Sequence, residues 1–136
     1  MEITELFGDN LSMQDLAEMS PLALAFVGDG VHTMYVRNNI VKSRIGKIGD
    51  YHSLCAKFCK AQTQSQVLDK ILPTLDDCEN DIVRRARNVK THNIAKNSDN
   101  ATYKKATSFE ALVGYLYLTG NHERMNQILK LSIKGE

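Results

Sequence analysis

Two acidic residues could do chemistry in this chain, because each is the lone charge in an apolar stretch. Asp29 is the one charged residue between residues 21 and 36, and Glu110 is the one charged residue between residues 107 and 118. An ionised carboxylate in apolar surroundings is costly unless a cation, a metal ion or hydrogen-bond donors compensate it. The economical interpretation is that the two acids meet around a divalent cation.

Two structural interpretations of these acids remain open from the sequence. Thr107 and Glu110 also fit a capping box, in which the carboxylate only bonds to the backbone at the start of a helix. Asp29 also has Arg37, His32 or a distant lysine as potential salt-bridge partners. The metal interpretation rests on the two acids taken together.

Helices must position both acids. Ser20 is a good N-cap and Pro21 a good first helical residue, so a helix is predicted from residue 21 to about 41. Its apolar residues cover every face, which predicts a helix in the middle of the fold. The second acid lies in a predicted helix over residues 109–118, which is apolar on nearly all sides.

Three glycines lie close to the acids and predict that the two helices approach closely. Gly28 and Gly30 flank Asp29, and Gly114 follows Glu110 by one helical turn. Without side chains at these positions, two buried helices can pack with short separations. We therefore expect the helix crossing itself to bring the carboxylates together.

The other elements are also predicted to be helices, which makes the fold all-α. Asp50 is a candidate N-cap, Pro73 ends a helix, and Thr74 is predicted to cap the next one. No linker or internal repeat divides the chain, so residues 1–136 are expected to form one compact helical domain. The remaining predicted helices cover residues 13–18, 50–71, 75–88 and 122–133.

A polar, basic segment interrupts this pattern and is predicted to be a long loop over residues 88–106. From Arg84 to Lys105 there are seven basic residues and one acid, a net charge of +6, while the rest of the chain carries −5. Such side chains donate charge-assisted hydrogen bonds to phosphate oxygens. A solvated surface loop is the alternative, but this loop leads directly into the helix of Glu110. The candidate phosphate-binding residues are Arg84, Arg85, Arg87, Asn88, Lys90, Lys96, Lys104 and Lys105.

The amino-terminal segment lacks the basic start and apolar stretch of a signal peptide. No uninterrupted apolar run is long enough to span a bilayer. We therefore expect a cytosolic protein without a membrane partner.

Three motifs in matching order resemble the catalytic domain of the ribonuclease III family. They are Phe26-Val27-Gly28-Asp29-Gly30-Val31, then Arg84-Arg85-Ala86-Arg87-Asn88, then Phe109-Glu110-Ala111-Leu112-Val113-Gly114-Tyr115-Leu116-Tyr117-Leu118. The likeness extends from about residue 20 to residue 118. Within the family, the chain resembles the mini-ribonuclease III group, whose members have the nuclease domain and no double-stranded-RNA-binding domain.

The chain also departs from the family pattern of Glu-x-x-Glu-Phe-Leu-Gly-Asp followed by Asp-x-x-Glu-Ala-Leu. Asp29 and Glu110 match the last acid of each run, whereas Leu22, Ala25 and Thr107 stand where the longer enzymes have acids. Two of the acids that surround the metals in the family therefore remain per subunit. This favours one strongly held Mg²⁺, with any second ion bound through water and substrate phosphate.

The resemblance implies a homodimeric, Mg²⁺-dependent endonuclease that cleaves double-stranded RNA and leaves 5′-phosphates and 3′-hydroxyls. Asp29 and Glu110 would be its catalytic and metal-binding residues, and the basic residues of the 84–105 segment would bind RNA. The expected substrate is precursor ribosomal RNA of the large subunit (23S), and a ribosomal protein is a candidate helper. Two rival hypotheses remain: a non-catalytic RNA-binding or ribosome-assembly module on the same fold, and a helical dimerisation protein.

Overall fold

Helices account for the regular structure of the described residues, which are 8–43, 46–89 and 100–134 in the computed structural model. Within these ranges no strand is present, so the prediction of an all-helical fold is confirmed. The helices are α2 (Met13–Glu18), α3 (Pro21–Ser43), α4 (Ile48–Cys59), α5 (Ala61–Ile71), α6 (Asp77–Arg87), α7 (Asn100–Leu118) and α8 (His122–Ile133), with a 3₁₀ turn at Leu72–Thr74. No helix in the described ranges is long and apolar enough to cross a membrane.

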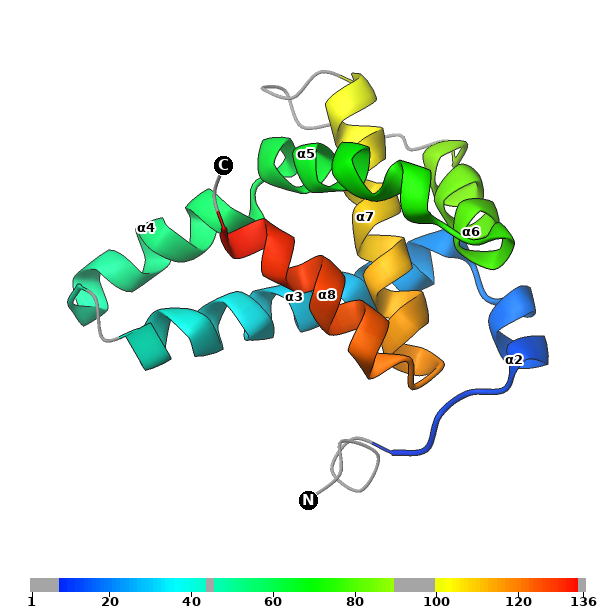
Figure 1. The fold of residues 1–136 in the computed structure, drawn as a ribbon, viewed down its shortest axis with the longest axis horizontal. Coiled ribbons are helices and arrows are strands. Elements are labelled where there is room, and N and C mark those ends of the chain that lie inside the picture. The colour runs from blue at the N-terminus through cyan, green and yellow to red at the C-terminus, as the bar shows by residue number, and fades with distance from the viewer. Residues whose placement is uncertain (1–7, 44–45, 90–99, 135–136) are drawn as a thin grey trace.

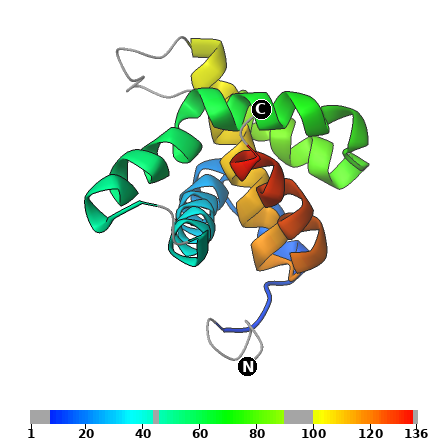
Figure 2. The same ribbon diagram turned by 60° about the vertical axis from the view of Figure 1, so that its left-hand side comes forward.

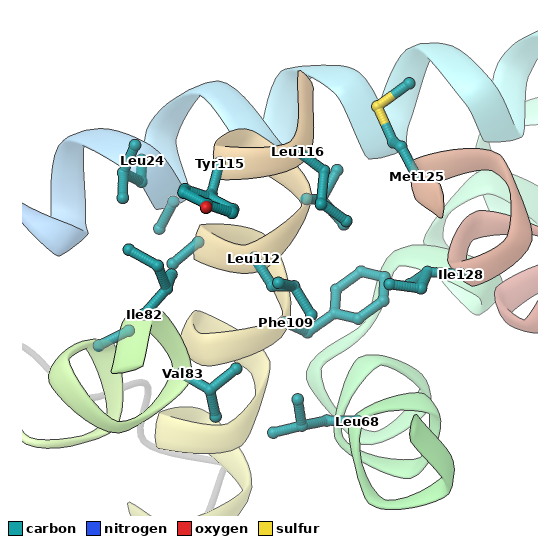
Figure 3. Packing of buried hydrophobic residues seen from close by; sticks show 14 of the residues in the cluster. Leu24, Leu68, Ile82, Val83, Phe109, Leu112, Tyr115, Leu116, Met125 and Ile128 are labelled. Atoms are coloured by element: carbon teal, nitrogen blue, oxygen red, sulfur yellow. The ribbon is translucent and has the colours of Figure 1, made fainter. Parts of the chain in front are cut away.

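Helix α7 is the centre of the fold, and α3, α5, α6 and α8 pack around it (Figures 1 and 2). Every residue from 106 to 116 is buried except Glu110, which is half-buried. Figure 3 shows Phe109 and Leu112 of α7 among side chains from the surrounding helices, including Leu24 and Leu68. Because the surrounding helices cover this part of α7 on all sides, residues 106–116 show no exposed polar face.

Helices α3 and α7 cross with their backbones in close contact. A β-carbon on Gly28 would overlap the carbonyl oxygen of Glu110, and a β-carbon on Gly114 would overlap the carbonyl oxygen of Leu24. The predicted close approach is therefore confirmed for these two glycines. It is wrong for Gly30, because a β-carbon there would meet no atom within 4 Å.

The prediction that α3 is buried on every face is wrong. Its residues facing α7 are buried, but Leu22, Phe26, Met34 and Val41 are 41%, 82%, 57% and 57% exposed. Asp29 is exposed as well. Thus α3 has one face in the core of the chain and an opposite apolar face that nothing in the described part of the chain covers.

The segment predicted as one helix over residues 50–71 forms two, α4 and α5. Lys60 takes an extended conformation between them, with φ −69° and ψ 155°. Thr63 Oγ1 donates to the carbonyl oxygen of Lys57 at 2.9 Å across the break. Asp50 is not the N-cap of α4 but lies inside its first turn, where it accepts from the backbone N–H of Lys47 at 3.1 Å.

The start of α6 also differs from the prediction. Its N-cap is Asp76 rather than Thr74, and Asp76 accepts from the backbone N–H of Glu79 at 2.7 Å. Glu79 bonds back to the backbone N–H of Asp76 at 3.1 Å, which completes a capping box. Pro73 ends α5 as expected, but the chain makes a 3₁₀ turn before α6 begins.

Helix α7 starts earlier than predicted, at Asn100 instead of residue 109. Lys104 and Lys105, which were predicted to lie in an irregular loop over 88–106, therefore lie on a helix. Lys90 and Lys96 lie outside the described residues. The helix over 122–133 was predicted correctly and is α8.

Candidate active site

Asp29 and Glu110 meet at the crossing of α3 and α7, as the sequence predicted. Their carboxyl groups form a side-chain hydrogen bond. The pKa of Glu110 is raised from 4.5 to about 8, mainly by burial and additionally by the hydrogen bond and negative charge of Asp29. The environments of the two acids differ, because Asp29 is exposed and Glu110 is half-buried.

Two carboxylates in contact are stable only if a proton or a cation lies between them. Here a proton on Glu110 fulfils that role, because burial and the neighbouring Asp29 both raise the pKa of Glu110. A divalent cation offers the same compensation with more charge, and carboxylate oxygens are ligands that Mg²⁺ prefers. The donor set therefore fits Mg²⁺. Within the described ranges, no group of three or more His, Cys, Asp or Glu side chains is placed to hold a metal.

The capping-box interpretation of Glu110 is wrong. Thr107 lies in the interior of α7, and its hydroxyl donates to the carbonyl oxygen of Tyr103 at 3.0 Å. The salt-bridge interpretation of Asp29 is not supported either, since Asp29 forms no ion pair with any residue that the structure describes. The two acids have each other as partners.

Two buried polar residues beside the acids were not assigned to the site from the sequence. His32, one turn after Asp29 on α3, is 0% exposed, and Gln64 of α5 is 3% exposed. Gln64 forms a side-chain hydrogen bond to Glu110 and lies 3.1 Å from His32 Nδ1. The spacing of His32 from Asp29 was a usable signal. The sequence offers no comparable sign for Gln64, because it does not distinguish this buried glutamine from its exposed neighbours Gln62 and Gln66.

Burial lowers the pKa of His32 to about 4, although the negative charge of Asp29 partly opposes this shift. The imidazole is therefore neutral near physiological pH. Its ring contacts Phe109 edge-on, with centroids 5.0 Å apart and planes at 70°. His32 thus lies near Asp29 on one side and contacts Phe109 of the core on the other.

The basic residues that the structure describes in this segment lie on α6 and α7, and several already have acidic partners. Arg84 pairs with Asp81 at 2.6 Å, and Lys105 pairs with Asp69 at 3.0 Å. Arg85 donates to the carbonyl oxygen of Met19 at 3.3 Å.

The other candidate phosphate-binding residues have no such acidic partner in the described ranges. Arg87 and Asn88 are exposed at the end of α6, and Lys104 is half-buried near the start of α7. Lys104 forms no salt bridge with a described residue. Arg87 and Lys104 are thus the charges most available to a phosphate.

Comparison with known proteins identifies the class. The ribonuclease III domain model matches residues 22–121. A mini-ribonuclease 3 of a Thermoanaerobacter species is 40% identical over 134 residues, which cover 98% of this chain and 92% of that protein. The mini-ribonuclease 3 of Desulfitobacterium hafniense is 44% identical over 108 residues, covering 79% of this chain and 68% of that protein. A crystal structure of a Fusobacterium nucleatum protein has a TM-score of 0.79 and 31% identity, and covers 89% of this chain and 97% of that chain.

The all-helical fold, with two acids at the crossing of its central helices, is that of an endoribonuclease domain. The chain belongs to the ribonuclease III family. Within it, the curated relatives to which the chain is similar over most of its length are mini-ribonuclease 3 proteins.

Proposed function

We propose that this protein is a Mg²⁺-dependent endoribonuclease that cleaves double-stranded RNA as a homodimer. The observation that carries the proposal is the hydrogen-bonded pair of Asp29 and Glu110, because two acids in contact need a proton or a cation between them and a divalent ion can replace the proton. Family membership supplies the reaction class. The pair supplies the place on this chain where that reaction would occur.

In this proposal the two acids hold the ion and neither is a nucleophile. Mg²⁺, when bound, supplies Lewis-acid chemistry that activates water and offsets negative charge on the reacting phosphate. Asp29 is exposed and would face the substrate, whereas Glu110 is half-buried on the central helix α7. With two acids, most of the coordination is left to water and substrate phosphate, so one strongly held ion is expected per subunit.

Basic residues near the two ends of the 88–106 segment are proposed to bind the RNA backbone. Arg87, Asn88 and Lys104 offer donors, while Arg84 and Lys105 would exchange exposed acidic partners for phosphates. Exposed ion pairs are weak, so this exchange costs little. A-form RNA presents phosphates and 2′-hydroxyls in a fixed geometry, and recognition would be largely of shape.

The exposed apolar face of α3 supports a homodimer. Phe26 is exposed on this face, and a hollow between α3 and α8 is lined mainly by apolar side chains, including Val31, Met34, Met125 and Leu129. Contiguous exposed apolar surface commonly marks an interaction site. A second copy of the chain is the occupant that family membership favours.

The substrate we propose is the precursor of large-subunit (23S) ribosomal RNA, cleaved at the stem formed by its paired ends. Similarity to mini-ribonuclease 3 proteins over most of the chain supports this choice. A ribosomal protein that binds the same precursor is a candidate helper. Adding such a protein to the cleavage assay, at the same salt, tests that role.

The deciding experiment incubates purified protein with an end-labelled RNA duplex that models the precursor stem. Cleavage that needs Mg²⁺ and yields 5′-phosphates supports the proposal, provided that DNA duplexes and single-stranded RNA stay intact. Binding without cleavage in Mg²⁺ or Mn²⁺ would instead select the non-catalytic RNA-binding module. Neither binding nor cleavage would select the dimerisation protein.

A further inference from the structure

A continuous line of buried polar groups leads from α3 through α5 to the acid on α7. His32 Nδ1 lies 3.1 Å from Gln64 Nε2, and Gln64 also forms a side-chain hydrogen bond to Glu110. Both His32 and Gln64 are almost fully buried. Burying an amide and an imidazole costs free energy that an apolar side chain of similar size would not incur.

The hydrogen-bond inventory fixes the direction of each bond. The amide nitrogen of Gln64 carries two N–H groups, and a carboxylate can only accept. Gln64 therefore donates to the ionised carboxylate of Glu110. The second N–H then donates to His32 Nδ1, 3.1 Å away, in the tautomer in which Nδ1 carries no proton.

His32 is suited to this role because its own orientation is fixed. Its ring is fully buried and packs edge-on against Phe109, the residue before Glu110. His32 Nε2, which carries the proton in this tautomer, has no hydrogen-bond partner in the described part of the chain. The ring therefore makes its one described polar contact with Gln64.

Rotating the Gln64 amide by 180° would break this arrangement. Its carbonyl oxygen would then face the ionised carboxylate of Glu110, which is repulsive, and His32 would have to move its proton to Nδ1 to keep a hydrogen bond to Gln64. An ionised Glu110 and a His32 with an unprotonated Nδ1 therefore favour the same amide orientation, in which Gln64 donates to both.

We propose that Gln64 is the positioning residue of the metal site, and that His32 holds its amide so that it orients the Glu110 carboxylate. The inference rests on the proposed function, since it assigns Glu110 to a metal ion. Neither side chain is catalytic, because neither is proposed to touch metal or RNA. Partners that orient a metal ligand in this way typically contribute about 10- to 100-fold in metal affinity.

The test measures Mn²⁺ binding without RNA, by the electron paramagnetic resonance signal of the free ion, and the Mg²⁺ concentration that gives half-maximal cleavage. Gln64→Met keeps the size of the side chain and removes both donors. We expect both metal constants to rise about 10- to 100-fold, with most of the cleavage rate recovered at saturating metal. Gln66→Met, at an exposed glutamine of the same helix, is the matched control and should change neither constant.

Variants of His32 test whether this residue holds the Gln64 amide, and they test the proposal even if Gln64→Met does not fold. Asn places an acceptor oxygen near the position of Nδ1, whereas Phe keeps the ring and removes the acceptor. We expect His32→Phe to weaken Mn²⁺ binding and His32→Asn to restore it, with folding of each checked by thermal denaturation.

Two results would overturn the inference. One is a folded Gln64→Met protein with the wild-type affinity for Mn²⁺, and the other is equal metal affinity in the two His32 variants. A wild-type protein that binds Mn²⁺ but cleaves no duplex RNA would instead count against the proposed function alone, because the binding measurement is independent of cleavage.

Discussion

Gly28 packs directly against the backbone of Glu110, so the carbonyl oxygen of Glu110 occupies the space that a side chain at residue 28 would need. Asp29 is the next residue along α3. The pairing of the two acids therefore depends on a missing side chain at their neighbour, and Gly114 makes the same kind of contact with Leu24 one turn away. The close packing of α3 and α7 at these two glycines therefore also sets the position of Asp29 relative to Glu110.

Gly28→Ala tests this dependence. The added methyl group meets backbone atoms, which cannot move aside as a flexible side chain would, so the helices must separate. We expect the free energy of unfolding in urea to fall by at least about 1–3 kcal/mol, as for other overpacked cores, together with a loss of cleavage. Gly49→Ala is the control, because the space around Gly49 on α4 is open. That variant should be neutral or stabilised by up to about 1 kcal/mol.

Asp29→Asn should abolish cleavage without harming the fold. Loss of a metal ligand removes several kcal/mol of charge stabilisation, so we expect the cleavage rate to fall by at least about a thousandfold. Asp29 is exposed and lies against another acid, so the unfolding temperature without metal should not decrease. Glu123→Gln, at an exposed acid of α8, serves as the control for a general loss of charge. A folded Asp29→Asn protein that cleaves at the normal rate in Mg²⁺ would exclude the metal role.

The raised pKa of Glu110 predicts how stability depends on pH when no metal is present. Between its ordinary value of 4.5 and its folded value of about 8, the folded state holds a proton that the unfolded state has released. Stability therefore falls as pH rises through this window. His32 has the opposite effect between about 4 and 6.5, so the effect of Glu110 is measured between pH 6.5 and 8.5.

We expect thermal unfolding of the metal-free protein to show this fall, and Mg²⁺ to raise the unfolding temperature most at the upper end of the window. Glu110→Gln has no proton to lose at this position, so its unfolding temperature should depend less on pH. Cleavage by this variant should be strongly reduced and partly rescued by Mn²⁺ or high metal concentration. An unchanged pH profile in Glu110→Gln would show that this carboxyl is not the group that titrates.

Lys104 and Lys105 are adjacent on α7 but differ in their partners, and this predicts different effects on RNA binding. Lys105 pairs with Asp69 at 3.0 Å, whereas Lys104 forms no described ion pair. If Lys104 binds one phosphate, Lys104→Ala should reduce the slope of log affinity against log salt by about 1. The slope should change less in Lys105→Ala and not at all in Lys130→Ala, a control on α8. Equal slopes in all three variants and the wild type would move the RNA surface away from α7.

Much of the helical architecture could be predicted from local signals. Ser20 and Pro21 gave the start of α3, and the apolar residues from Phe109 onward indicated the core of α7. The break at Lys60 and the start of α7 at Asn100 could not be predicted in this way. The chain around Lys60 carries no glycine or proline to mark the break, and the first turn of α7 is polar because it extends beyond the core.

The sequence predicts the candidate site from two charges in apolar helices, but only one of the two acids is shielded from solvent. Asp29 is exposed, so the argument from burial holds for Glu110 alone. The apolar residues around Asp29 made α3 resemble a fully buried helix. A single sequence does not distinguish apolar residues that pack within a chain from those that face a partner.

Phe26 offers the sharpest test of such a partner, because its side chain is 82% exposed on α3. Burying a phenylalanine contributes about 1.5–3 kcal/mol, so Phe26→Ser should weaken a homodimer by at least about tenfold. Sedimentation equilibrium measures this dissociation directly. Ile48→Ser is the matched control, since Ile48 is 75% exposed but lies on α4. Dissociation caused by Ile48→Ser and not by Phe26→Ser would place the interface on α4 instead of on the face of α3 beside Asp29.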